Sequence, residues 1–195
     1  MQEKGKRQLQ AEATKDKLFY AANALLLEKD YKDITIRDIT AKAEVSIGTF
    51  YHYFPTKVDV FYETYRLADQ YFIEVIAPQL TQPTAYERIA AFCDHYAHYS
   101  SDQTHPQLIY LLYNAENPHF NRDPQHGMRG VLTEVIQQGI DSGEIDSTDT
   151  ASQISEFLMV TLRGVVYNWV TLHRSYDLAE TVRWYLERLL KAYFA

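Results

Sequence analysis

The sequence predicts an all-α protein with a small N-terminal helix-turn-helix domain, residues 1–57, followed by a larger helical domain, residues 58–195. Apolar residues recur three and four positions apart, and no segment shows the strict alternation typical of half-buried strands. Prolines and capping residues divide this pattern into separate helices. Between residues 34 and 61, two short helical patterns are separated by a break of only three residues, which indicates a helix-turn-helix.

Composition narrows the class of protein before any motif is considered. The chain is 46% hydrophobic and 23% charged, as is ordinary for a globular protein. No apolar run approaches the ~18–20 residues of a membrane span, and the first ten residues lack the apolar core of a signal peptide. A single cysteine, Cys93, excludes an internal disulfide framework and fits a reducing compartment. We therefore expect a cytoplasmic protein without membrane association.

The charge is distributed unevenly along the chain. Residues 1–60 carry 10 Lys and Arg against 9 Asp and Glu, whereas residues 61–195 carry 9 against 17. The formal net charge of -7 therefore resides in the second domain. A nearly neutral first domain gives weak support to nucleic-acid binding, since phosphate contacts normally need a local excess of Lys and Arg. The basic residues of the first 17 positions are either a solvated tail or an arm that touches phosphates.

Each N-terminal helix has a recognisable beginning or end. The first, about residues 9–29, has one apolar face with Leu18, Leu25 and Leu26, and the polar stretch 30–33 ends it. Thr35 can cap the second, residues 36–43. The third, about 47–54, stacks two phenylalanines four residues apart. In a helix-turn-helix, this last helix enters the major groove of DNA.

Projection of the third helix separates an inner from an outer face. Phe50 and Phe54 lie together and face the core, while Thr49 and Tyr53 lie on another side, with Tyr51 at an edge. Gly48 near the helix start permits close approach of the backbone to another surface. Two interpretations of the tyrosines stay open: hydroxyl contacts with DNA phosphates, or packing against the neighbouring domain.

The second domain is expected to consist of helices only. Pro78 ends the first of them, an Asn-Pro pair breaks the third, and Asp177 resembles the start of a capping box before the last. The expected helices cover residues 58–77, 83–100, 104–115, 123–143, about 147–173, and 178 to near the C-terminus.

A motif within these elements resembles a known family. The segment from Thr35 to Lys57, and above all G-T-F-Y-H-Y-F-x-x-K at residues 48–57, resembles the N-terminal domain of the TetR family of bacterial transcriptional regulators. The resemblance by motif covers roughly residues 9–61. One departure is Glu44, where many members have glycine in the turn.

The resemblance implies a homodimer that binds double-stranded operator DNA and responds to a small-molecule effector, most often as a repressor. Ser46, Gly48, Thr49 and Tyr53 should lie near bases or phosphates. The other residues that it places near the backbone or flanking bases are Thr35, Arg37, Tyr51 and Lys57. The resemblance also implies that the last two long helices pair with their copies; their apolar faces are otherwise internal core. These faces contain Leu158, Leu162, Val165, Trp169, Val182, Leu186, Leu189 and Tyr193.

Aromatic residues of the second domain suggest an effector cavity, because apolar walls with a few hydroxyls suit small organic ligands. The alternative is a tyrosine-rich core. The candidate lining residues are Tyr96, Tyr99, Tyr110, Tyr113, Arg163 and Tyr167. Nothing in the sequence identifies the ligand.

No catalytic motif is present: the chain lacks GxSxG, HExxH, P-loop and CxxC patterns, so we expect no enzyme and no cofactor. Asp94, His95 and His98 have the spacing of a metal-binding helix edge, but a polar helix surface is the simpler interpretation and no metal is expected. A different class of function stays open, a DNA-bound adaptor whose second domain binds a protein partner in place of a small molecule.

Overall fold

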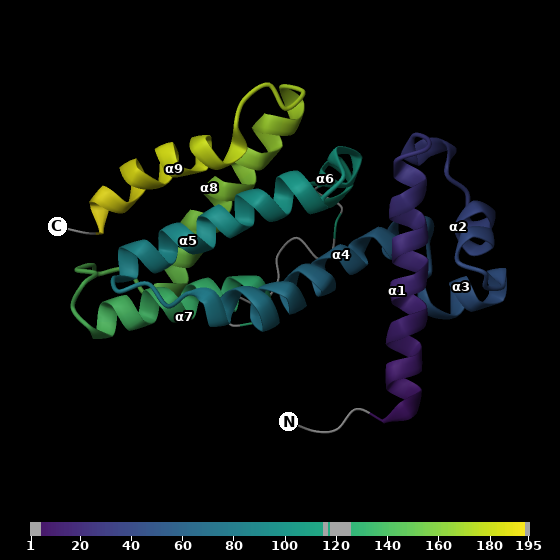
Figure 1. Ribbon diagram of the computed structural model, residues 1–195, viewed down its shortest axis with the longest axis horizontal. Helices are drawn as coiled ribbons and strands as arrows, with labels where there is room; N and C mark the ends of the chain where they lie inside the picture. The colour runs from purple at the N-terminus through teal and green to yellow at the C-terminus, as the bar shows by residue number, and fades with distance from the viewer. Residues whose placement is uncertain (1–4, 115–116, 118–125, 194–195) are drawn as a thin grey trace. The chain divides into compact units, whose positions relative to one another are not determined.

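All regular structure in the described residues is helical, as expected. The structure is a computed structural model that describes residues 5–114, 117 and 126–193 (Figure 1). No described helix is long and apolar enough to cross a membrane. The α-helices are α1 Lys6–Leu26, α2 Ile36–Lys42, α3 Ile47–Tyr53, α4 Lys57–Tyr71, α5 Ala85–His98, α6 Pro106–Leu112, α7 Gly127–Asp141, α8 Ala151–Thr171 and α9 Leu178–Leu189.

The chain forms two compact units, and each unit is made of two separate segments of the sequence. Unit 1 runs to Tyr65 and includes a second segment that starts at His105 and contains α6. Unit 2 contains residues 66–104 and 120–195, so that α4 begins in unit 1 and continues into unit 2. The functional boundary after residue 57 stays a prediction.

Unit 1 packs α1 against α2, and α2 against α3 (Figure 1). Its core contains Leu18, Ile39 and Phe50, each fully buried. Glu44 follows α2 with φ 55°, where the Val45 amide donates to Thr40 O (3.0 Å) and the Glu44 amide to Ala41 O (3.3 Å). This pair of bonds is a Schellman motif, in which glycine is the residue that adopts the left-handed conformation without strain.

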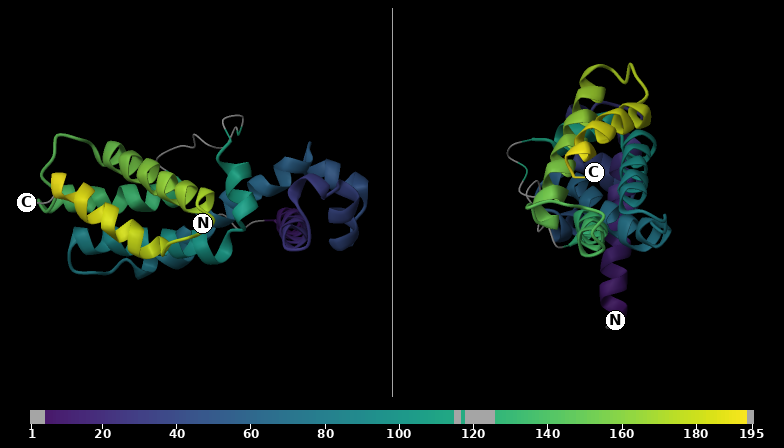
Figure 2. Two further views of the ribbon diagram at one scale, coloured as in Figure 1. Left: turned by 90° about the horizontal axis from the view of Figure 1, so that it is seen from above. Right: turned by 90° about the vertical axis from the view of Figure 1, so that its left-hand side faces the viewer.

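Unit 2 is a helical bundle in which α5 packs against α7 and α9, and α7 packs against α8 (Figures 1 and 2). Two of its helices end in π-helical turns, η2 Phe72–Ile76 after α4 and η4 Tyr99–Gln103 after α5. A short 3-10 turn, η3 Ala77–Gln79, follows η2, and η5 Leu190–Ala192 ends α9. The two π-turns meet in an aromatic cluster, in which Tyr99 contacts the rings of Tyr71 and Phe72.

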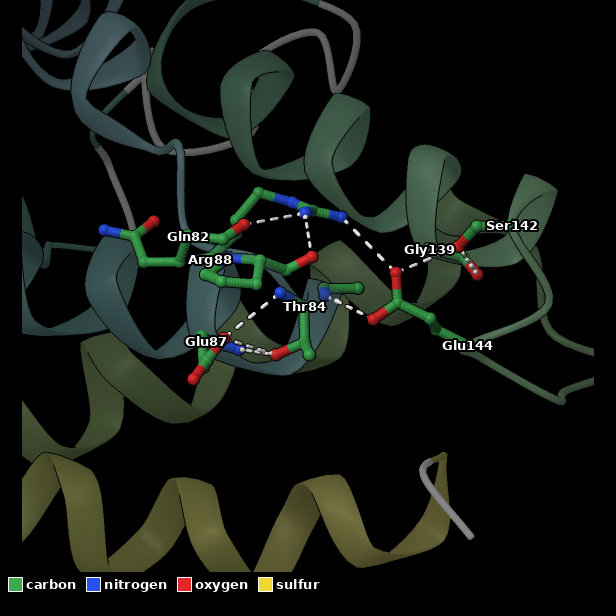
Figure 3. Close-up of polar contacts among 9 residues, drawn as sticks. Gln82, Thr84, Glu87, Arg88, Gly139, Ser142 and Glu144 are labelled. Carbon is green, nitrogen blue, oxygen red and sulfur yellow. Dashed lines mark hydrogen bonds and ion pairs between the residues drawn. The ribbon is translucent and has the colours of Figure 1, made fainter.

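A cluster of polar side chains joins the start of α5 to the loop after α7 (Figure 3). The Glu144 carboxylate accepts hydrogen bonds from the Ala85 amide (2.6 Å) and the Ser142 hydroxyl (3.0 Å), and lies 3.6 Å from Arg88 Nη2. The Ala85 amide is the principal cause that lowers the pKa of Glu144. This carboxylate therefore satisfies an N–H group that the first turn of α5 cannot satisfy internally.

Most predicted helix limits agree with the structure to within a few residues. The first helix begins three residues before the expected start, and the helix expected through Ser100 becomes π-helical from Tyr99. The predicted start of the helix at Asp123 lies outside the described residues.

Candidate nucleic-acid interface

The two short helices of unit 1 begin with side-chain caps that fix their first turns. The Thr35 hydroxyl accepts from the Asp38 amide (3.2 Å), and the Asp38 carboxylate accepts from the Thr35 amide (2.8 Å). At α3, the Ser46 hydroxyl accepts from the Thr49 amide (2.9 Å) and lies 2.8 Å from the Thr49 hydroxyl. Three of the predicted DNA-binding residues therefore already form caps, and these caps hold the helix starts in place.

The α3 helix has one buried and one exposed side, as the projection predicted. Phe50 is fully buried, and Phe54 directly after the helix is 3% exposed. Tyr51 is 55% exposed and Tyr53 half-buried. Ile47 is 41% exposed. This exposure was not indicated by the sequence, because an apolar residue at this position suggests the core. An exposed isoleucine at the start of such a helix can contact a thymine methyl group, so Ile47 joins the candidate residues.

Gly48 is exposed, and the fold itself does not require glycine there. A Cβ added at this position would meet only Ser46 Oγ, at 3.6 Å, which is ordinary van der Waals contact. Glycine also lowers helix propensity. The absence of a side chain on this exposed first turn therefore fits close approach to a surface outside the protein.

Arg37 differs from the lysines around it. Lys29 binds the Asp38 carboxylate at 2.7 Å and Lys42 binds Glu28 at 2.6 Å. The guanidinium of Arg37, on the exposed side of α2, makes no hydrogen bond or ion pair within the part of the chain that the structure describes. Its guanidinium is therefore available for a phosphate or base contact at no cost in internal bonds.

Lys57, at the start of α4, is bound within the protein. Its ammonium donates to Tyr31 O and to Ile34 O, both at 2.8 Å, and lies 4.1 Å from the centre of the Tyr31 ring. Burial lowers the pKa of this ammonium. Two of its three N–H donors are engaged, so that one remains for a phosphate. Its predicted DNA contact stays a prediction, and the structure adds a second role in fixing the turn at residues 31–34.

Comparison with known proteins agrees with this geometry. Residues 18–64, which contain α2, α3 and the start of α4, match the family described as "Bacterial regulatory proteins, tetR family". This segment of the chain is of the TetR type. The TetR-family proteins similar to it are transcriptional regulators, and a helix-turn-helix with an open outer face is the part that binds DNA.

One curated relative covers nearly the whole chain. The fatty acid metabolism regulator protein of Bacillus subtilis is 25% identical over 175 residues, 87% of this chain and 90% of its own length. Among solved structures, FadR from Bacillus subtilis in complex with stearoyl-CoA is 22% identical, with a TM-score of 0.68 over 89% of this chain and 96% of that chain.

Two further TetR-type structures share the fold. FadR from Thermus thermophilus in complex with lauroyl-CoA is 19% identical, with a TM-score of 0.70 over 90% of this chain and 93% of that chain. RolR in complex with resorcinol is 16% identical, with a TM-score of 0.67 over 96% and 90%. Because these ligands differ so widely, the fold alone does not identify an effector.

Most of the predicted dimer residues are buried within the protomer, and their place in a dimer interface stays a prediction. The six buried side chains are Leu158, Leu162, Val165, Trp169, Val182 and Leu186. Leu189 and Tyr193 are half-buried. The most apolar stripe of a helix packs into its own domain first, so these side chains contribute to the core of the protomer.

The predicted pocket residues do not form one group. Tyr110 and Tyr113 belong to unit 1, whereas Tyr96, Tyr99, Arg163 and Tyr167 belong to unit 2. Tyr110 and Tyr167 are more than 40% exposed, whereas Tyr96 and Tyr99 lie in the aromatic cluster around Phe72. Which of these residues contact an effector stays a prediction.

The side chains that suggested a metal or a reactive thiol have other roles. Asp94 forms a two-pronged ion pair with Arg183, at 2.8 and 3.0 Å, and the described residues contain no cluster of metal-binding side chains. Cys93 is buried, and burial raises the pKa of its thiol. A buried thiol of this kind is inert and acts as a small apolar residue.

Proposed function

We propose that this TetR-family regulator is a repressor that binds operator DNA as a homodimer and releases it when an acyl-CoA binds in unit 2. The observation that supports the effector class is the relative with fatty acid metabolism in its name, at 25% identity over 87% of the chain. Two structures of similar fold hold stearoyl-CoA and lauroyl-CoA. These ligands favour a small-molecule effector over the alternative of a protein partner.

The DNA-reading surface in this proposal is the outer side of α2 and α3. Ile47, Tyr51 and Gly48 expose the start and one flank of α3, and Arg37 extends from α2. Direct readout of bases needs side chains at the start of the inserted helix, and phosphate contacts fix its position. A repressor of this kind acts on the bacterial chromosome, so we place it in the cytoplasm.

The dimer surface in this proposal is the outer face of α8. Six of its exposed positions, flanked by exposed Glu156 and Asn168, follow one another at steps of four and three residues and carry no charge: Gln153, Phe157, Val160, Gly164, Tyr167 and Thr171. This spacing is that of a coiled-coil seam, and Gly164 has no atoms near a would-be Cβ, which leaves room for another helix. On α9, Trp184 and Tyr185 are also exposed.

The dimer surface has a direct test. We expect Val160→Glu to produce monomers, because two carboxylates would face each other at the seam, and to abolish operator binding at physiological salt. Glu134→Gln, a charge change at an exposed position of α7, serves as control. Sedimentation velocity measures the oligomeric state, and dimers of the Val160→Glu protein would refute the assignment.

The effector proposal is tested with an operator selected by the protein from a random DNA pool. Stearoyl-CoA and lauroyl-CoA should each weaken operator binding, by a factor within the roughly 5–150-fold range usual for coupled sites. Free CoA and free stearate serve as controls, since each carries only half of the ligand. An unchanged operator affinity at saturating acyl-CoA refutes this effector class.

A further inference from the structure

The turn between α1 and α2 is held by side chains from two distant parts of the chain. This turn contains η1, Tyr31–Asp33, and leads directly to Thr35, the N-cap of α2. Lys57 of α4 binds its carbonyl groups, as described above. The side chain of Gln107, in α6, also binds this turn. The conformation of the turn therefore depends on residues that lie 26 and 76 positions further along the chain.

Gln107 uses both ends of its amide on two consecutive residues. Its Oε1 accepts a hydrogen bond from the Tyr31 amide at 2.8 Å, and its Nε2 donates to the Asp30 carboxylate at 3.0 Å. The bond to the carboxylate is charge-assisted, so it is stronger than a bond between neutral groups. A side chain with an acceptor and a donor at one end is needed for this fork, which restricts the position to glutamine or asparagine.

The far end of α6 is fixed to unit 1 as well. The Leu112 carbonyl accepts hydrogen bonds from Tyr65 Oη at 3.1 Å and from Asn117 Nδ2 at 2.7 Å. The Asn117 side chain also donates to Tyr65 Oη at 2.9 Å, and Asn117 is 5% exposed. Both ends of α6 are thus bonded to the unit that contains α2 and α3.

The same helix is where the chain passes from one unit to the other. Unit 2 ends its first segment at Thr104, and α6 begins two residues later, after the π-helical turn η4. A change in η4 therefore reaches α6 through the covalent chain. From α6, the Gln107 amide reaches the turn, and the turn leads to the cap of α2.

We propose that Gln107 is a positioning residue for the helix-turn-helix: its amide sets the turn at residues 30–34 and relays the state of unit 2 to α2 and α3. The positioning role is independent of the effector. The relay rests on the proposed function, because it needs a ligand that acts on unit 2.

The first experiment tests positioning without any effector, on a DNA duplex selected by the wild-type protein. Gln107→Ala removes the fork, and Gln107→Glu places a carboxylate beside Asp30. Both should weaken operator binding at least about fivefold, the lower end of typical coupling between sites. The double variant Asp30→Asn, Gln107→Glu reverses donor and acceptor, keeps the net charge, and should recover most of the affinity. Gln138→Ala, at an exposed position of α7, serves as matched control.

Two measurements separate positioning from a loss of folding. Far-UV circular dichroism should show wild-type helix content, and hydrogen exchange should show faster exchange of the Tyr31 amide in Gln107→Ala. Wild-type affinity of both single variants overturns the proposal. So does a double variant that binds no better than Gln107→Glu, because the restored hydrogen bond would then have no effect on the DNA-binding helices.

The second experiment tests the relay with stearoyl-CoA. In Gln107→Ala the ligand should bind with wild-type affinity in the absence of DNA, while its effect on operator affinity falls at least about fivefold relative to wild type. An equal effect in both proteins overturns the relay. If wild-type operator binding does not respond to stearoyl-CoA, the proposed function fails, and the effector-free experiment still decides the role of Gln107.

Discussion

Lys57→Met is the substitution whose effect follows most directly from the structure. Methionine keeps most of the apolar stem and removes the donors to Tyr31 O and Ile34 O. Tyr31 O retains the Ile34 amide at 3.2 Å, whereas no other donor to Ile34 O is found among the described residues. An unsatisfied buried carbonyl costs about 1–3 kcal/mol, and loss of the contact with the Tyr31 ring about 0.5–1 kcal/mol. We expect unit 1 to lose about 1.5–4 kcal/mol of stability.

Urea unfolding measures this loss of stability, and two spectroscopic signals of the protein distinguish the units. Both tryptophans, Trp169 and Trp184, belong to unit 2, whereas far-UV circular dichroism reports all helices. In Lys57→Met, the loss of helix should begin at a lower urea concentration than in wild type. This first change should be larger in the circular dichroism signal than in the tryptophan fluorescence, because unit 1 unfolds first. Lys42→Met, which removes only an exposed ion pair with Glu28, is the matched control and should cost at most about 1 kcal/mol.

The outcome that refutes the argument is a Lys57→Met protein that unfolds at the same urea concentration as wild type. The salt dependence of operator binding tests the phosphate contact separately. A slope of log K against log salt that falls by about 1 in Lys57→Met indicates that the third donor reaches a phosphate. An unchanged slope restricts Lys57 to its structural role.

Three further predictions concern the caps and turns of unit 1. Gly48→Ala should raise stability by up to about 1 kcal/mol in urea unfolding and still weaken operator binding; loss of stability would contradict the free space around Gly48. Glu44→Gly should stabilise by about 1 kcal/mol because φ is 55°, whereas Glu44→Gln, which removes only the charge, should not. Lys29 and Thr35 lower the pKa of Asp38 to about 2, so ionised Asp38 stabilises the folded state fully above about pH 4, and this stability is lost as the pH falls towards 2. Asp38→Asn should remove that part of the pH dependence of the melting temperature; an unchanged pH profile would show that Asp38 does not contribute.

Local signals in the sequence were sufficient for the helix-turn-helix. Thr35 and Ser46 are good N-cap residues, and Phe50 and Phe54 define a core face by their spacing alone. Even the departure at Glu44 marked the position with a left-handed conformation. These features depend on neighbours within a few residues, which is the range that a sequence pattern reports.

Features that depend on distant neighbours could not be predicted in the same way. The periodicity of α8 shows one strongly apolar face, and that face is buried in the protomer; the proposed dimer face is recognised by exposure and lack of charge. The partners of Gln107 and Lys57 lie on the turn at residues 30–34, and no local rule connects them. The π-helical turns also escape prediction, because the same residues suit an α-helix.

The discontinuity of unit 1 has a consequence for synthesis on the ribosome. The chain between Tyr65 and Gln107 has to be made before α6 can join the first segment of the unit. At roughly 5–20 residues per second, this takes about 2–8 s, during which the nascent helix-turn-helix lacks the amide that fixes its first turn. A fragment or a gene fusion that ends within α4 lacks Gln107, so its helix-turn-helix never gains the amide that fixes the turn at residues 30–34. A transplantable DNA-reading module of this protein therefore has to include α6.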